Sequence, residues 1–306
     1  MSIRYDGKVA IVTGAGGGLG RSHAIELAKR GAKVVVNDLG GSVSGEGANS
    51  AASEAVVAEI EALGGEAMAH PANVADYGQV QDMVEQTMAR WGRVDILVNN
   101  AGILRDKSFS KGSLEDFRLV MDVHLMGSVH CSRAVWEIMK AQEYGRIVMT
   151  TSPSGLYGNF GQTNYGAAKM GVVGMMNTLV QEGVKYNIHV NALSPTAGTR
   201  MTEGLMSQQA FELLTPESVT PAVLFLASEQ APNRCILGAG AGTFAVVSIV
   251  ESDGMWLPED SQTPEGIAEH WQQISSGGEK PLKGGFEQTF KMVAKAAEGK
   301  GITLEG

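Results

Sequence analysis

The chain has 306 residues, 43% hydrophobic and 19% charged, which excludes a largely disordered, collagen-like or coiled-coil protein. A formal net charge of −9 disfavours nucleic-acid binding, because a negative surface repels phosphate polymers. The two cysteines, Cys131 and Cys235, are too few for a disulfide framework and fit a reducing compartment. No apolar run resembles a signal peptide or a membrane span, so we expect a cytoplasmic protein that does not bind membranes.

Short apolar runs alternate with longer stretches of helical periodicity along most of the chain. The apolar runs predict strands at residues 8–13, 33–37, 66–70, 94–99, 146–151 and 189–193. The periodic stretches predict helices at residues 19–30, 53–63, 77–91, 114–142, 163–185 and 216–227. Continuous apolar strands are typical of a sheet covered on both sides. The order therefore predicts an α/β fold, a single Rossmann-type doubly wound parallel sheet with helices on both faces.

Three segments do not follow this alternation. Residues 40–50 form a long glycine- and serine-rich loop after the second strand, and residues 196–215 are interpreted as a flap. The chain becomes glycine- and charge-rich from residue 277, with one helix expected at 286–297. We therefore expect one domain at 1–276 and a peripheral C-terminal tail at 277–306.

A glycine-rich motif, TGAGGGLG at residues 13–20, lies between the first predicted strand and the first predicted helix. Glycines at this place let backbone N–H groups approach a pyrophosphate at the helix N-terminus. The alternative is a glycine-rich turn without a ligand. We expect the cofactor contacts of this motif to come from Gly14, Gly18, Leu19 and Gly20.

Asp38 closes the second predicted strand, 18 residues after Gly20. At this spacing a carboxylate reaches the hydroxyls of the adenosine ribose and repels a 2′-phosphate. The residue therefore favours NAD over NADP, although the nearby cation of Arg21 weakens the preference. The alternative is that Asp38 only starts the following loop.

Three further groups of polar residues carry a signal, two of them at predicted strand ends and one on a predicted helix. The sequence NNAG at 99–102 ends the fourth strand, and Ser152 ends the fifth. Tyr165 and Lys169 are four residues apart on a predicted helix, so they share one face, and the ammonium can stabilise a phenolate. A Tyr-x-x-x-Lys pair alone occurs often by chance, and its weight comes from the other motifs.

Together these motifs resemble the short-chain dehydrogenase/reductase family. The resemblance implies that Tyr165 is the general base, that Ser152 orients the substrate oxygen, and that Lys169 and the positive nicotinamide lower the pKa of Tyr165. It also implies that Asn73 and Val74 contact adenine. The remaining cofactor contacts that we expect are Asn100, Ala101, Gly102, Tyr165, Lys169 and Pro195.

One departure from the family pattern narrows the resemblance. The chain has His124, in MDVHL, where the family usually carries Asn. This stretch, NDLGG at 37–41 and GLYGNFGQ at 155–162 look like the dehydrogenase part of peroxisomal multifunctional enzyme type 2. That family oxidises (3R)-3-hydroxyacyl-CoA and some hydroxysteroids. His124 is then either a packed, hydrogen-bonded residue or part of a proton relay that links Lys169 to solvent.

The sequence leaves two alternatives to a (3R)-3-hydroxyacyl-CoA dehydrogenase. One is a hydroxysteroid dehydrogenase of the 17β type, or another secondary-alcohol dehydrogenase, because the fold does not determine the substrate. The other is a non-catalytic NAD sensor, which the intact Ser152, Tyr165 and Lys169 argue against. The histidines form no tight ligand cluster, so no metal is expected.

Two expectations concern partners. The helices at 114–142 and 163–185 carry apolar residues on more than one face, and the resemblance implies that they form the interface of a homodimer. The residues that illustrate this pattern are Val135, Met139, Val172 and Met176. A CoA ester brings phosphates to an acidic protein, so local cations near the site are needed. The candidates are Arg105, Lys107, Lys111 and Arg200.

Overall fold

The computed structural model describes residues 2–42, 44–47, 49–197, 208–278 and 280–304. They divide into two compact units, Met1–Val246 and Val247–Gly306. The division lies well before the boundary at residue 276 that we expected, because β8 is the last element that belongs to the sheet.

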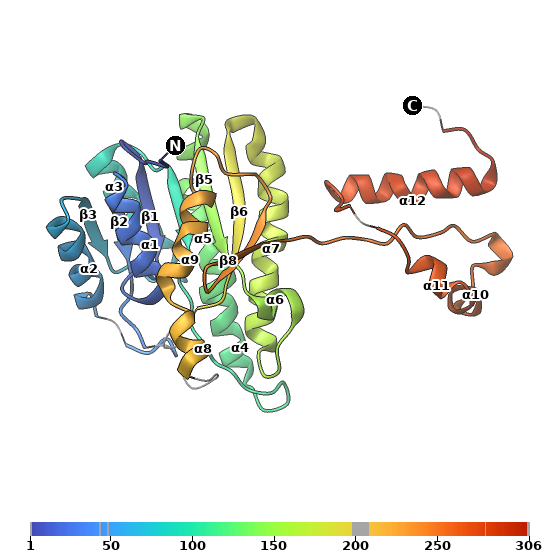
Figure 1. Ribbon diagram of the computed structural model, residues 1–306, viewed down its shortest axis with the longest axis horizontal. Coiled ribbons are helices and arrows are strands. Elements are labelled where there is room, and N and C mark those ends of the chain that lie inside the picture. The colour runs from blue at the N-terminus through green and yellow to red at the C-terminus, as the bar shows by residue number, and fades with distance from the viewer. Residues whose placement is uncertain (1, 43, 48, 198–207, 279, 305–306) are drawn as a thin grey trace. The chain divides into compact units, whose positions relative to one another are not determined.

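One eight-stranded sheet forms the centre of the first unit (Figure 1). Its strands are β1 (Val9–Thr13), β2 (Lys33–Asn37), β3 (Glu66–His70), β4 (Ile96–Asn99), β5 (Gly145–Thr150), β6 (Ile188–Pro195), β7 (Ile236–Gly240) and β8 (Thr243–Val247). The order is β3-β2-β1-β4-β5-β6-β7-β8, and β1 to β7 pair in parallel. The carboxyl ends of the parallel strands therefore meet at one edge, where ligands of such sheets bind. The expected Rossmann-type fold is confirmed.

Helices cover both faces of this sheet (Figure 1). Their bounds are α1 (Gly18–Lys29), α2 (Ala51–Ala62), α3 (Tyr77–Trp91), α4 (Leu114–Met121), α5 (Gly127–Gln142), α6 (Pro153–Tyr157), α7 (Thr163–Gly183), α8 (Gln208–Leu213) and α9 (Pro216–Leu226). Helices α1, α2 and α9 pack together on one face, while α3 packs on α5 and α4 packs on α7 on the other. The predicted helices and strands agree with these elements to within two residues, with the exceptions below. Helices α6 and α8 were not predicted, because they are too short to show hydrophobic periodicity, and α8 lies within the segment 196–215 that we interpreted as a flap.

Two further parts of the first unit differ from the expectation. The helix predicted at 114–142 contains a π-helical turn, Asp122–Met126, between α4 and α5. Hydrophobic periodicity does not distinguish such a turn from the surrounding α-helix. Strands β7 and β8 were not predicted, because their sequences, ILGAG and TFAVV, lie in an uncharged stretch with several glycines.

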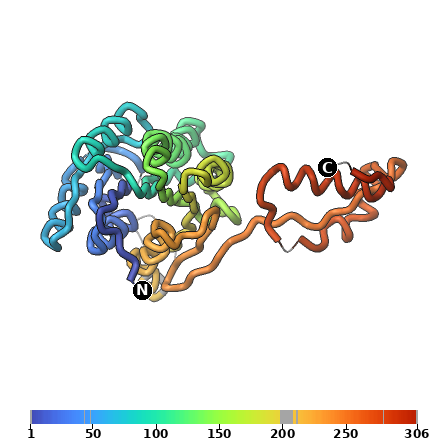
Figure 2. The backbone as a smooth tube through the Cα atoms, turned by 90° about the horizontal axis from the view of Figure 1, so that it is seen from above, coloured from blue at the N-terminus to red at the C-terminus, as the bar shows by residue number. Residues whose placement is uncertain are grey.

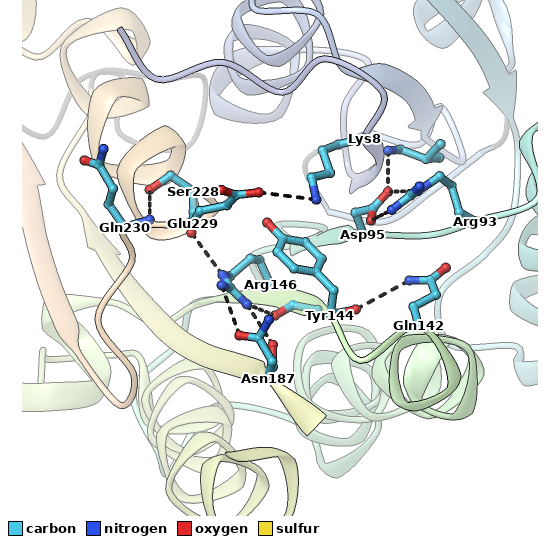
Figure 3. Close-up of polar contacts among 12 residues, drawn as sticks. Lys8, Arg93, Asp95, Gln142, Tyr144, Arg146, Asn187, Ser228, Glu229 and Gln230 are labelled. Atoms are coloured by element: carbon cyan, nitrogen blue, oxygen red, sulfur yellow. Dashed lines mark hydrogen bonds and ion pairs between the residues drawn. The ribbon is translucent and has the colours of Figure 1, made fainter. Parts of the chain in front are cut away.

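The amino edge of the sheet is held by two buried charged residues (Figure 3). Arg146 is 2% exposed, and its guanidinium donates to the carbonyl oxygens of Ser228 (2.9 Å) and Asn187 (2.8 Å). The Asp95 carboxylate is fully buried and accepts two hydrogen bonds of 2.7 Å from Arg93. Because these buried charges have satisfied hydrogen bonds, they hold β4, β5, β6 and the end of α9 together at the amino edge of the sheet, opposite the carboxyl edge.

The second unit contains α10 (Pro264–Glu269), α11 (Trp271–Ile274) and α12 (Gly285–Lys300). Within it, α12 lies beside the extended segment that precedes α10 (Figure 2), and Lys291 contacts Glu251 at 3.0 Å. The helix expected at 286–297 is confirmed as part of α12. No helix in the described part of the chain is long and apolar enough to cross a membrane.

Candidate active site

A cavity of about 350 Å³ lies at the carboxyl edge of the sheet. Its lining includes the predicted residues Gly14, Gly18, Leu19, Gly20, Asp38, Asn73, Val74, Asn100, Ala101, Gly102, His124, Tyr165, Lys169 and Pro195. Thus the fold brings together residues that are up to 181 positions apart in the chain, from Gly14 to Pro195. Ser152 is not part of the lining but hydrogen-bonds Tyr165.

Several lining residues were not predicted, among them Asn37, Ala72, Ile103, Leu119, Val123 and Thr150. Most are ordinary apolar residues with no signal in the sequence. For Thr150 the sequence contained a signal that we did not use. This residue is close to Ser152, at the end of the same strand.

The glycine motif forms a tight turn at the start of α1. Gly17 caps this helix without a side-chain hydrogen bond, and its first turn contains no acidic residue. The first N–H groups of a helix have no partner inside the helix and attract anions. A Cβ atom at Gly20 would overlap the Gly14 carbonyl oxygen, so glycine is required there. The motif is therefore suited to hold a pyrophosphate.

The Asp38 carboxylate is fixed at the wall of this cavity. Its Oδ2 accepts from the Gly16 N–H at 2.8 Å and its Oδ1 accepts from the Gly40 N–H at 2.7 Å. A carboxylate held in this way retains lone pairs that can accept hydroxyl groups, and it repels a phosphate.

Two side chains, those of Asn37 and His130, contact the backbone of residues 72–75 in the cavity wall. The Asn37 amide donates to the carbonyl oxygens of His70 (3.1 Å) and Ala72 (2.9 Å). His130 Nδ1 lies 2.9 Å from the Val74 oxygen. These contacts fix the backbone of residues 72–75 at the cavity wall, where the apolar side chains of Ala72, Val74 and Ala75 suit a purine ring.

Tyr165 lies on α7 beside Ser152, the N-cap residue of α6. Burial raises the pKa of Tyr165 above 10, and the hydrogen bond with Ser152 lowers it by less. Without the cofactor burial outweighs the other contributions, and the expected lowering of this pKa by Lys169 together with the positive nicotinamide stays a prediction. Desolvation disfavours the phenolate, and the neighbouring charges do not compensate.

Lys169 is 3% exposed, with Nζ 5.5 Å from the centre of the Tyr165 ring. The ammonium donates to the Thr150 oxygen at 2.7 Å, and burial lowers the pKa of Lys169 to about 7. Lysine and tyrosine thus lie close enough for each to respond to the charge of the other.

His124 lies in the π-helical turn and is 3% exposed. Its ring meets the Tyr165 ring edge-on, with centroids 5.0 Å apart, and its Nε2 lies 2.7 Å from the Ile103 oxygen. Burial and the charge of Lys169 lower the pKa of His124. Among the described contacts neither ring nitrogen of His124 hydrogen-bonds to Lys169, so the packed alternative describes the structure and the relay stays a prediction.

The cations expected near the site have different surroundings. Arg105 is held by Asp116 (3.2 Å) and Glu46 (3.4 Å). For Lys107 and Lys111 no ion pair is found among the described residues, and Arg200 lies outside them. Lys107 and Lys111 are therefore the remaining described candidates for an anionic substrate. The described residues also contain no group of three or more His, Cys, Asp or Glu that could hold a metal.

The chain is similar in sequence to known enzymes. A family model described as short chain dehydrogenase matches residues 8–210. The chain is 45% identical to peroxisomal multifunctional enzyme type 2 of Drosophila melanogaster, over 99% of this chain and 52% of that protein. It is 47% identical to a short-chain type dehydrogenase/reductase of Mycobacterium tuberculosis, over 88% of this chain and 94% of that one. The chain thus spans about half the length of the Drosophila relative.

Solved structures give the same picture. The full-length Drosophila enzyme superposes with a TM-score of 0.81 at 39% identity, covering 97% of this chain and 50% of that chain. A 7α-hydroxysteroid dehydrogenase, solved with NADH and 7-oxo glycochenodeoxycholic acid, superposes with a TM-score of 0.70 at 30% identity. That match covers 78% of this chain and 95% of the other.

Proposed function

The chain belongs to the short-chain dehydrogenase family, and we propose that it oxidises the 3-hydroxyl of a (3R)-3-hydroxyacyl-CoA with NAD. It is an oxidoreductase that acts on CH–OH groups with a nicotinamide cofactor. The observation that carries the proposal is the presence of Tyr165 and Lys169, with Ser152 beside Tyr165, at the cavity that also contains the glycine motif and Asp38.

The choice of NAD is supported by the fixed carboxylate of Asp38. A 2′-phosphate at the adenosine ribose would meet a like charge whose two oxygens are already held by backbone N–H groups. Arg21, the nearby cation, is paired with Glu59 at 2.5 Å and is thereby partly neutralised. We expect kcat/KM for NAD to exceed that for NADP by about 10² or more, since such a clash costs several kcal/mol.

The protein's part in the reaction is proton transfer and orientation. The nicotinamide, when bound, accepts the hydride from the carbinol carbon. Ser152 orients the substrate oxygen, and Tyr165 Oη takes the hydroxyl proton. Because the pKa of Tyr165 lies above 10 in the protein alone, oxidation should speed up as pH rises and the phenolate becomes more populated. His124 fixes the Tyr165 ring in place by its edge-on contact, whether or not it also relays protons.

Two classes of substrate suit this site. The resemblance to the dehydrogenase part of the multifunctional enzymes favours a 3-hydroxyacyl-CoA. A hydroxysteroid remains the second candidate, because a structural relative is a hydroxysteroid dehydrogenase. The apolar side chains of Ile103, Leu119 and Val123 line the cavity and suit an acyl chain or a steroid ring alike.

The experiment that tests the proposal measures NADH release with (3R)- and (3S)-3-hydroxyacyl-CoAs of several lengths and with a panel of hydroxysteroids. We expect the highest kcat/KM with a (3R)-3-hydroxyacyl-CoA. A higher kcat/KM with a hydroxysteroid would make a hydroxysteroid the favoured substrate. NADH binding without turnover of any alcohol would favour a non-catalytic NAD sensor. The cytoplasmic location stays a prediction, and the Drosophila relative is named peroxisomal.

A further inference from the structure

Arg105 connects three segments of the fold around the candidate cofactor cavity. Its Nε donates to the Ser44 carbonyl oxygen at 2.8 Å, and its Nη2 lies 3.4 Å from Glu46 Oε1. Both partners belong to the loop at residues 40–50, which we call the 40–50 loop. On the other side, Nη1 lies 3.2 Å from Asp116 Oδ1, in the first turn of α4. The side chain is 25% exposed, so these contacts are partly shielded from water.

The 40–50 loop forms part of the cavity wall. Gly41, Ser42 and Gly45 line the cavity together with Asp38 at the base of the loop. The backbone at Gly45 packs on Ile103, because a Cβ atom there would lie 3.1 Å from Ile103 Cγ2. The 40–50 loop therefore packs on Ile103, two residues before Arg105 in the chain.

The other hydrogen bonds that the described residues of this loop make are local. Ser42 N–H donates to the Glu46 oxygen and Gly45 N–H donates to the Ser42 oxygen, both within the loop. At its base, Asn49 N–H donates to the Leu39 oxygen. Among the described residues, the hydrogen bonds that join the tip of the loop to another part of the fold come from the Arg105 side chain.

Arg105 is itself fixed beside the catalytic helix. Its carbonyl oxygen accepts from the Asn164 amide at 3.1 Å. Asn164 Oδ1 in turn accepts from the Tyr165 N–H at 2.7 Å. The backbone of Arg105 is thus positioned by α7, while its side chain reaches across to the 40–50 loop.

We propose that Arg105 is a positioning residue for the nicotinamide cofactor, which holds the 40–50 loop in its place on the cavity wall before the cofactor binds. The inference rests on the proposed function. Four of the eleven residues of the loop are glycines, so an untethered loop has many conformations to lose. A binding surface that is ordered beforehand spares the cofactor that cost.

The first test replaces the side chain and leaves the backbone contact with Asn164. Arg105→Met should weaken NADH binding, measured by fluorescence titration, by about tenfold, the loss expected for a partly exposed charged hydrogen-bond donor. The NADH affinity of Arg105→Lys should fall between those of the wild type and Arg105→Met. Arg118→Met is the matched control, because Arg118 is an exposed arginine of α4 with no ion pair among the described residues. The KM for NAD should rise by more than kcat changes, since the side chain does not contact Tyr165.

A second test moves the loop without changing Arg105. Gly45 and Gly47 both have positive φ, +84° and +83°, so an alanine strains both sites alike. Only at Gly45 would the added Cβ meet Ile103, while nothing lies within 4 Å at Gly47. Gly45→Ala should therefore weaken NADH binding more than Gly47→Ala does.

Hydrogen exchange of the cofactor-free protein gives a readout independent of activity. Amides of the 40–50 loop should exchange faster in Arg105→Met than in the wild type, with unchanged exchange in Arg118→Met. Unchanged NADH affinity or unchanged loop exchange in Arg105→Met would overturn the positioning role and leave the proposed function standing. A wild-type protein that binds no nicotinamide cofactor would overturn both.

Discussion

Three consecutive residues at the end of β5, Thr150, Thr151 and Ser152, position Tyr165 and Lys169 of α7. The Thr150 carbonyl oxygen accepts from the Lys169 ammonium, and Thr151 Oγ1 donates to the Lys169 carbonyl oxygen at 2.6 Å. Ser152 hydrogen-bonds the phenol of Tyr165. A strand that is buried and paired on both sides thus fixes the side chain and the backbone of the catalytic helix turn.

Removal of the Tyr165 hydroxyl should abolish turnover and leave binding intact. Tyr165→Phe deletes the proton-accepting oxygen and keeps the ring that packs on His124. We expect kcat to fall by about 10² or more, the usual contribution of a general base, while NADH binding is retained. Tyr157→Phe is the matched control, since Tyr157 is 72% exposed. A Tyr165→Phe enzyme that keeps more than about a tenth of kcat would contradict the assignment.

The buried ammonium of Lys169 should make stability depend on pH. Burial lowers its pKa from 10.5 to about 7, so between these values the unfolded chain binds more protons at this position than the folded one. Stability contributed by Lys169 therefore rises with pH through this window and is least favourable below about pH 7.

Urea unfolding of the cofactor-free wild type and of Lys169→Met measures how the stability contributed by Lys169 depends on pH. The advantage of Lys169→Met over the wild type should be largest near about pH 6 and shrink by about pH 9, because the unfavourable buried charge is lost as Lys169 deprotonates. The same advantage at both pH values would show that the Lys169 pKa is not lowered.

At the scale of elements, the π-helical turn between α4 and α5 has the clearest consequence for the site. It places His124 against Gly102, where a Cβ atom would overlap the imidazole ring. The same ring packs on Tyr165. One irregular turn therefore connects the strand-end motif of β4 to the catalytic side chain of α7, in keeping with the frequency of π turns at functional sites.

The contact between α6 and α7 depends on Gly155. A Cβ atom there would lie 2.8 Å from Lys169 Cβ and 2.9 Å from the Lys169 carbonyl carbon. Gly155→Ala should separate the helices, cost about 1–3 kcal/mol of stability as overpacking does, and lower kcat. Gly174→Ala on α7 is the control, because nothing lies within 4 Å of its added Cβ.

Denaturant unfolding and steady-state kinetics of both variants decide the point. Gly174→Ala should be as stable as the wild type or more stable by up to about 1 kcal/mol, as for a helical glycine replaced by alanine. Equal stability and kcat in Gly155→Ala and Gly174→Ala would show that the close approach of α6 to α7 does not matter.

At the scale of the whole molecule, the expected homodimer stays a prediction, and the four residues that illustrated its interface do not lie on the surface of the chain. Val135, Met139, Val172 and Met176 are at most 1% exposed within one chain, so they belong to its core. Large apolar side chains that remain exposed beside α5 and on α7 include Met126 (40%) and Met170 (39%).

Light scattering measures the assembly directly. We expect twice the chain mass of 32.2 kDa at micromolar concentration, because two-fold pairing of long helices is the common way to cover such side chains. The monomer mass would reject the dimer. Loss of the dimer in a variant with Asp at both Met126 and Met170 would place the interface at these residues.

The sequence by itself determined the parts of the protein that local chemistry dictates. Continuous apolar strands such as those at Val34 and Ile147 are buried wherever a parallel sheet forms, so the order of β1 to β6 and of the long helices between them followed from pattern alone. The glycine motif and the Tyr165–Lys169 spacing act within one turn, and the fold brings both to the same cavity.

Tertiary structure alone decided which groups surround each side chain, because those neighbours come from distant parts of the chain. Arg105 is paired with Glu46 and Asp116 rather than free for a phosphate, and periodicity gave no sign of either contact. The direction of the Tyr165 pKa shift likewise depends on burial by segments far away in sequence. Sequence spacing specifies which residues share a face, whereas the electrostatic environment of a residue is set by what packs against that face.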